Sequence, residues 1–121
     1  MSPTIVLDEE GTVQAVAGAS GGPRIITGTM QVLLNVLSGM DASKAVAAPR
    51  LHHQWMPNQV LFEEGYSVYI LNVLGNPLRG YKHTIGSKDA VVGNVQVIVR
   101  DKEGWQAASD PRKGGRPSGI D

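Results

Sequence analysis

The stretch from Gly18 to Arg24, with the sequence GASGGPR, carries the clearest chemical potential in the chain. It follows an apolar run, Val13 to Ala17, that predicts a strand, and it precedes Ile25 to Leu37, whose apolar spacing predicts a helix. Glycines at such a junction allow a sharp turn and leave backbone N–H groups uncovered by side chains. The first N–H groups of a helix have no internal partner, and the helix dipole favours negative charge there. The stretch is therefore a candidate site for an anion or an oxyanion.

The same stretch satisfies the pattern G-x-S-x-G between a strand and a helix, as the nucleophile elbow of α/β-hydrolases does. In that interpretation Ser20 is a nucleophile, and Asp41 and His83 supply the acid and the histidine that follow it in the chain. Against it, the chain is short for a parallel hydrolase sheet, and its strands are arranged as hairpins. Serine is also a preferred residue at helix starts, so the alternative is that Ser20 is the N-cap of the following helix.

Two further patterns suggest ligands only weakly. A Walker phosphate loop needs Lys and then Ser or Thr after its last glycine, whereas Pro23 and Arg24 follow here, so no nucleotide site is predicted. His52 and His53 are neighbours on a predicted strand and point to opposite faces, so they cannot easily share one metal ion. We expect one of these two histidines to be packed inside and the other to lie at the surface, with no metal bound.

The composition limits the classes of partner. The chain has 121 residues, enough for one domain with a real core, and its 11 basic and 11 acidic side chains balance. This balance gives no general attraction to nucleic acids or anionic membranes. There is no cysteine, which removes disulfides, thiolate metal sites and a cysteine nucleophile. No apolar run approaches the roughly 20 residues of a membrane span, and the first residues do not resemble a signal peptide. No cofactor is predicted.

Local patterns predict an α+β fold with hairpins and short helices. Asp41 is expected to cap the second helix, and the glycine-rich and charged end of the chain is expected to be a solvated extended tail containing an Asp–Arg turn. In chain order the predicted elements are strands at 4–7 and 12–17, helices at 25–37 and 42–48, strands at 51–55 and 59–62, a helix at 66–74, strands at 81–85, 91–100 and 105–108, and the tail at 110–121.

Five blocks of sequence, in order, resemble the C-terminal part of the small subunit of γ-glutamyltransferases, members of the N-terminal-nucleophile hydrolase superfamily. They are MSPTIV at residues 1–6, GASGG at 18–22, APRLHHQW at 48–55, GNVQVI at 93–98 and ASDPRKGG at 108–115. The resemblance covers nearly the whole chain, so residues 1–121 are expected to form a single partial domain of an incomplete αββα sandwich.

The resemblance also implies a reaction, the transfer of a γ-glutamyl group from glutathione or related amides to water, an amino acid or a peptide. In the family the nucleophile is a threonine at the N-terminus of the small subunit, freed by autocatalytic cleavage of a precursor. The backbone N–H groups of the family's glycine pair, which correspond to Gly21 and Gly22, form the oxyanion hole. The implied partners are the large subunit and the N-terminal part of the small subunit, and family members are commonly periplasmic, secreted or on the cell surface.

The matched blocks begin after the family's serine pair, and the nucleophile and the residues that hold the substrate's α-amino group lie upstream of that pair. The arginine that binds the substrate carboxylate belongs to the large subunit. Thr4 does not replace the nucleophile, because it follows Pro3 inside a predicted strand. We therefore expect no γ-glutamyl transfer by these residues alone. A serine hydrolase using Ser20 and a non-catalytic remnant or interaction domain stay open as alternatives.

Overall fold

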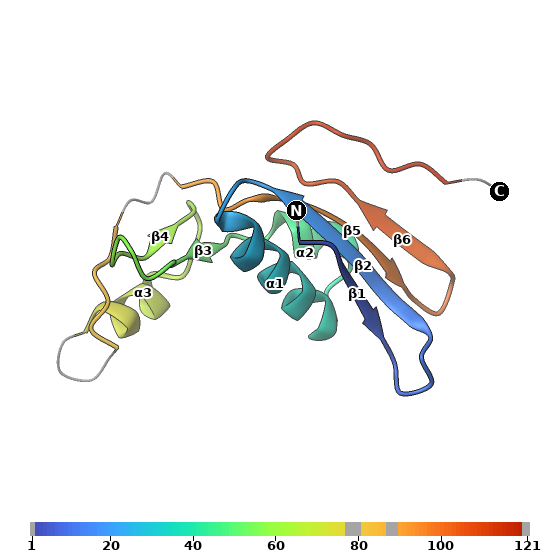
Figure 1. Ribbon diagram of the computed structural model, residues 1–121, viewed down its shortest axis with the longest axis horizontal. Coiled ribbons are helices and arrows are strands. Elements are labelled where there is room, and N and C mark those ends of the chain that lie inside the picture. Colours follow the sequence, from blue (N-terminus) through green and yellow to red (C-terminus); the bar gives the residue numbers. More distant parts are fainter. Residues whose placement is uncertain (1, 77–80, 87–89, 120–121) are drawn as a thin grey trace. The chain divides into compact units, whose positions relative to one another are not determined.

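The computed structural model describes residues 2–76, 81–86 and 90–119 (Figure 1). Its elements in chain order are β1 (Thr4–Leu7), β2 (Val13–Ser20), α1 (Arg24–Leu37), α2 (Ala42–Ala47), β3 (Leu51–His52), β4 (Leu61–Phe62), α3 (Val68–Gly75), β5 (Asn94–Arg100) and β6 (Trp105–Ala108). They fall into two compact units, one of Met1–Ala48 with Gly93–Asp121 and one of Pro49–Val92. The single partial domain expected over residues 1–121 stays a prediction.

The first unit contains a four-stranded antiparallel sheet in the order β1-β2-β5-β6. Both predicted hairpins, β1–β2 and β5–β6, are confirmed. The central pair joins β2 to β5, with Ala17 opposite Val97 and Ser20 opposite Asn94. β2 runs to Ser20, three residues beyond the predicted end, so its last pair lies directly beside the glycine stretch.

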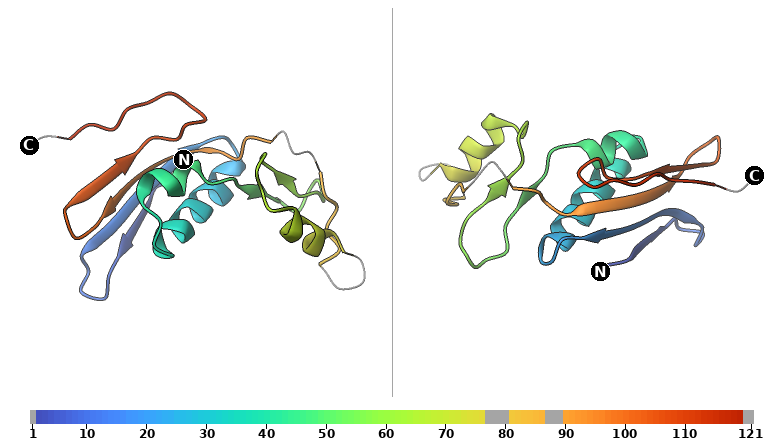
Figure 2. Two further views of the ribbon diagram at one scale, coloured as in Figure 1. Left: turned by 180° about the vertical axis from the view of Figure 1, so that it is seen from behind. Right: turned by 90° about the horizontal axis from the view of Figure 1, so that it is seen from above.

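Helices α1 and α2 pack on one face of this sheet, α1 over β2 and β5 and α2 over β5 and β6 (Figure 2). Alternate residues of each strand point toward the helices, as the two-residue period of a strand requires. The small alanines of β2 allow α1 to lie close to the sheet. The buried core consists of Ala15, Ala17, Ala19, Val32, Leu33, Ala42, Ala45, Val46, Val95, Val97 and Ala108.

The opposite face of the sheet is exposed and carries a group of large apolar side chains. They are Ile5, Leu7, Val16, Ile98 and Trp105, and the polar Gln96 and Arg100 of β5 lie on the same face. Over part of this face lies a hollow of about 580 Å³, lined by strand residues and by Pro117, Ser118 and Gly119 of the tail. Within the described part of the first unit, one helical layer covers one side of one sheet. That is half of the four layers that an αββα sandwich contains.

The two helices of the first unit begin in different ways. The expectation that Ser20 caps α1 is wrong: the N-cap is Pro23, which makes no side-chain cap hydrogen bond, and Ser20 ends β2. Gly21, Gly22 and Pro23 separate the strand from the helix, so the serine lies too early to reach the first helical N–H groups. The Asp41 cap of α2 is confirmed, since its carboxylate accepts a hydrogen bond from Lys44 N at 2.8 Å. This bond lowers the pKa of Asp41 below its usual value.

The second unit contains short elements. β3 pairs with β4, with Leu51 opposite Phe62, but β3 ends at His52 instead of the predicted residue 55. The chain turns there, because Trp55 has a left-handed backbone with φ of 76°. The helix predicted at 66–74 is present as α3, which begins after its cap Ser67 and ends at Gly75. The strand predicted at 81–85 is reduced to one bridge between Ile85 and Val60.

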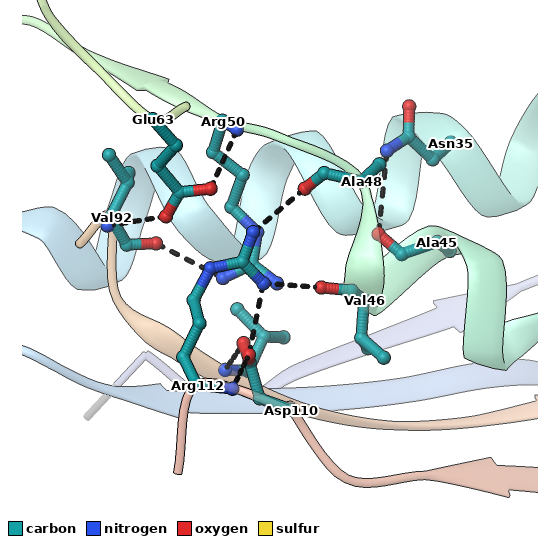
Figure 3. A network of polar contacts seen from close by, with 10 residues as sticks. Asn35, Ala45, Val46, Ala48, Arg50, Glu63, Val92, Asp110 and Arg112 are labelled. Carbon is teal, nitrogen blue, oxygen red and sulfur yellow. Dashed lines mark hydrogen bonds and ion pairs between the residues drawn. The ribbon is translucent and has the colours of Figure 1, made fainter. Parts of the chain in front are cut away.

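Arg50 and Glu63 are both buried, and their hydrogen bonds connect the beginning of the second unit to its end at Val92 (Figure 3). The Glu63 carboxylate accepts hydrogen bonds from Arg50 N at 2.9 Å and from Val92 N at 2.8 Å. The Arg50 guanidinium donates to Val92 O at 3.1 Å through Nη1. A buried charge of this kind is tolerated only when it is hydrogen-bonded. These contacts therefore fix how the first and last residues of the second unit lie together.

We expect Glu63→Ala to lower the free energy of unfolding of the second unit by about 3 kcal/mol, because two buried N–H groups lose their acceptor. Glu64→Ala is the matched control, since Glu64 is exposed, and it should change the free energy by less than about 0.5 kcal/mol. Urea unfolding followed by Trp55 fluorescence in a Trp105→Phe background measures both. Equal losses in the two variants would contradict the assignment.

Candidate active site

The junction between β2 and α1 is built by Gly21 and Gly22. Both residues are exposed and have positive φ, 135° for Gly21 and 61° for Gly22, which residues with a side chain adopt only at a cost. Their carbonyls already take part in the first helical turn: Gly21 O accepts from Arg24 N at 3.3 Å and Gly22 O accepts from Ile25 N at 3.2 Å. The loop is therefore anchored through its carbonyl oxygens.

The N–H groups of the same two residues have a different environment. Across the described ranges, no hydrogen bond uses the N–H of Gly21 or Gly22. They stand at the start of α1, a 14-residue helix whose dipole makes this end favourable for negative charge. Two adjacent donors with this location can stabilise an oxygen that gains negative charge during a reaction.

The loop rests on the start of β5, a relation that the sequence analysis missed. A Cβ atom added to Gly21 would lie 3.0 Å from Gly93 Cα, and one added to Gly93 would lie 3.2 Å from Arg24 O. Neither contact can relax by moving a side chain, since both involve backbone atoms. Gly93 also has a positive φ of 70°. The only signal in the sequence is a glycine immediately before the β-branched run, which predicts a turn but does not predict what it touches.

Ser20, Asp41 and His83, the three residues of the serine-hydrolase interpretation, each have different contacts. Ser20 is exposed at the end of β2. The Asp41 carboxylate caps α2 and forms an ion pair with Lys44 Nζ at 2.9 Å. His83 belongs to the second unit, where its ring lies 4.9 Å from that of His53 between centroids. These contacts give Asp41 a structural role and give no support to a triad.

The neighbouring histidines differ in burial, as expected. His52 is 2% exposed and its Nε2 lies 2.8 Å from Gln54 Oε1, whereas His53 is half-buried and its Nε2 lies 3.2 Å from Asn58 Oδ1. Among the described residues, no three His, Asp or Glu side chains are grouped as a metal site would require. Nor does any helix in the described ranges have the length and apolar character needed to cross a membrane.

The start of the tail is not solvated, so that expectation is wrong for Asp110, which is 1% exposed (Figure 3). The predicted Asp–Arg turn is present: Asp110 Oδ1 accepts from the backbone N and from the Nη1 of Arg112, both at 3.0 Å. The other carboxylate oxygen accepts from Val95 N at 2.8 Å. Arg112 also donates to the carbonyls of Val46 and Ala48 at the end of α2. Asp110 and Arg112 are therefore held by tertiary contacts, although the composition of this segment predicts that it is solvated.

A family model described as gamma-glutamyltranspeptidase matches residues 1–120 of this chain. The glutathione hydrolase proenzyme of Escherichia coli is 37% identical over 113 residues, and glutathione hydrolase 2 of Arabidopsis thaliana is 38% identical over 139 residues. The solved γ-glutamyltranspeptidase of Pseudomonas nitroreducens, in complex with L-DON, superimposes with a TM-score of 0.81 at 32% identity and covers 100% of this chain. The chain belongs to the γ-glutamyltranspeptidase family.

The family assignment identifies the architecture. The sheet with helices on one face is part of the N-terminal-nucleophile hydrolase fold of the γ-glutamyltranspeptidases, as the resemblance implied. The matched residues make up 93% of this chain but only 19% of the E. coli relative, and 99% of this chain but only 23% of the Arabidopsis relative. They make up 62% of the solved chain. These residues therefore represent about a fifth of the length of the γ-glutamyltranspeptidase relatives they match.

The contacts of the glycine pair predict an order of stabilities among alanine variants. Gly22→Ala meets open space and should cost about 1 kcal/mol for its left-handed backbone. Gly11→Ala is the matched control, because Gly11 also has a positive φ and open space, and it should cost the same. Gly21→Ala should cost at least about 3 kcal/mol, since its Cβ meets the Gly93 backbone. Urea titrations of the three variants give these values, and a Gly21 variant as stable as the Gly22 variant would refute the contact.

Proposed function

We propose that these residues are part of a γ-glutamyltranspeptidase that moves the γ-glutamyl group of glutathione or related amides to water, amino acids or peptides. The observation that supports this most is that, in a chain of this family, the N–H groups of Gly21 and Gly22 make no hydrogen bond within the described residues. The relatives named above are called glutathione hydrolases, which supports glutathione as a substrate.

In this proposal the two amides form the oxyanion hole. When a nucleophile attacks the γ-carbonyl carbon of the substrate, the carbonyl oxygen becomes negatively charged, and Gly21 N–H and Gly22 N–H donate hydrogen bonds to it. The start of α1 adds the positive end of the helix dipole. Each such donor stabilises the transition state by about 3 to 4 kcal/mol, because it is already oriented before the charge develops.

The nucleophile comes from polypeptide outside these 121 residues, as a threonine with a free α-amine that accepts the hydroxyl proton. Thr4 does not meet this requirement: it lies in β1 opposite Ala17, and its hydroxyl donates to Ser2 O at 3.3 Å. The exposed apolar face of the sheet is consistent with cover by the large subunit and the N-terminal part of the small subunit. The chain by itself is therefore expected to be inactive.

The test is a chimera in which these residues replace the matching segment of the E. coli glutathione hydrolase proenzyme. The chimera should release the chromophore from a γ-glutamyl anilide, and the chain alone should not. Gly22→Pro, which removes one N–H, should lower kcat by about a hundredfold to a thousandfold. Gly11→Pro is the matched control in the β1–β2 turn and should leave kcat within about twofold, even where stability falls. Equal kcat in the chimera with and without Gly22→Pro would overturn the assignment.

The same proteins separate the alternatives. A fluorophosphonate probe that labels the chain, with labelling lost in Ser20→Ala, would support a serine hydrolase instead. A folded chimera without activity, beside an active E. coli proenzyme, would support a non-catalytic remnant. Under the proposed function the probe does not label Ser20, and the chimera is active.

A further inference from the structure

A buried carboxylate completes the sheet near the glycine loop. The last pair of the β5–β6 ladder joins Val97 to Ala108, so Val95 lies beyond the end of β6. Its N–H points to the side where no strand residue continues, and Asp110 Oδ2 accepts it at 2.8 Å. Asp110 thus takes the place of the next strand residue and holds the start of β5.

Asp110 is in turn held on its other side. Its Oδ1 accepts from Arg112 N and Nη1, and the guanidinium donates to Val46 O at 2.7 Å and to Ala48 O at 3.0 Å (Figure 3). The side chain of Asp110 is fully buried and that of Arg112 is 15% exposed. The carboxylate is therefore fixed by the end of α2 and cannot move without breaking several hydrogen bonds.

The segment that Asp110 holds is the support of the glycine loop. Asn94, next to Val95, pairs with Ser20, and the preceding Gly93 lies against the backbone of Gly21 and Arg24. A displacement of the start of β5 would therefore change the contact that holds Gly21 and, through the chain, the position of the adjoining Gly22. The connection runs entirely through backbone contacts and one carboxylate, all within the first unit.

We propose that Asp110 is a positioning residue for the Gly21 and Gly22 donors, acting through Val95 and Gly93. This inference rests on the proposed function for its catalytic consequence, although the positioning itself can be measured without activity. Asp110→Asn tests it, because asparagine offers one acceptor oxygen and one NH₂ donor. In one orientation the NH₂ group faces Val95 N–H and releases the start of β5 directly. In the other it faces Arg112 N–H and releases residue 110 from Arg112, so either orientation weakens the support of β5.

Asp101→Asn is the matched control at the far end of β5. Asp101 Oδ1 accepts from Glu103 N at 2.8 Å and from Gly104 N at 2.9 Å, and its Oδ2 accepts from Gln106 Nε2, so the same substitution removes one acceptor oxygen from the distal turn. The chain contains 15 glycines, and ¹⁵N-glycine labelling therefore reports on both ends of the sheet. Asp110→Asn should shift the amide resonances of Gly21 and Gly22 and leave Gly104 unchanged, whereas Asp101→Asn should do the reverse.

Unshifted Gly21 and Gly22 resonances in a folded Asp110→Asn chain would overturn the proposal. If that variant does not fold, Asp110→Glu keeps the charge and both acceptors but lengthens the side chain, and the same two resonances must then shift. In the E. coli chimera, Asp110→Asn should lower kcat by at least about tenfold with KM within about twofold, while Asp101→Asn changes neither. If the parent chimera is inactive but Asp110→Asn shifts the Gly21 and Gly22 resonances, the proposed function is refuted and the positioning role stands. If the parent chimera is active but Asp110→Asn changes neither the resonances nor kcat, the positioning role is refuted.

Discussion

The backbone of Gly93 lies against the backbone of Gly21, and the geometry of the candidate active site depends on this approach. There is no room between them for a Cβ atom. The strand β5 and the loop after β2 are therefore in contact through main-chain atoms, which cannot change rotamer to accommodate a shift. A loop held in this way keeps its N–H groups in one orientation without using them in hydrogen bonds of its own.

The buried carboxylates follow a common pattern. Asp110 in the first unit and Glu63 in the second each accept a backbone N–H group just beyond the end of a ladder, Val95 N beside β5–β6 and Arg50 N beside β3–β4. Burial of a carboxylate is costly, and the cost is offset when several N–H groups surround it. Such a group specifies one arrangement of the chain more strictly than an apolar side chain of the same size, because any displacement leaves a donor unpaired.

The sequence predicted what depends on neighbours along the chain. The alternation of Val95, Val97 and Val99 located β5, and Asp41 was recognised as a cap because its acceptor role is local. The errors come from tertiary contacts. Ser20 has the right residue type for a cap but lies in a strand that pairing with Asn94 extends. Asp110 stands among residues typical of a solvated tail, and its burial depends on Val95 and α2, which no local pattern links to it.

The glycine pair could be identified as a candidate site because glycines between a strand and a helix form a pattern of neighbours along the chain. Its support by Gly93 could not be predicted, since Gly93 is far away in the sequence. This difference bears on how the site works. The loop, its support and the carboxylate behind them lie in one compact unit, so the donors are oriented by contacts already present in these residues. The exposed apolar face of the same sheet, with Val16, Ile98 and Trp105, has the character of a surface that another layer covers. Under the proposed function, N–H donors that are oriented in advance need no rearrangement when negative charge develops on the substrate oxygen.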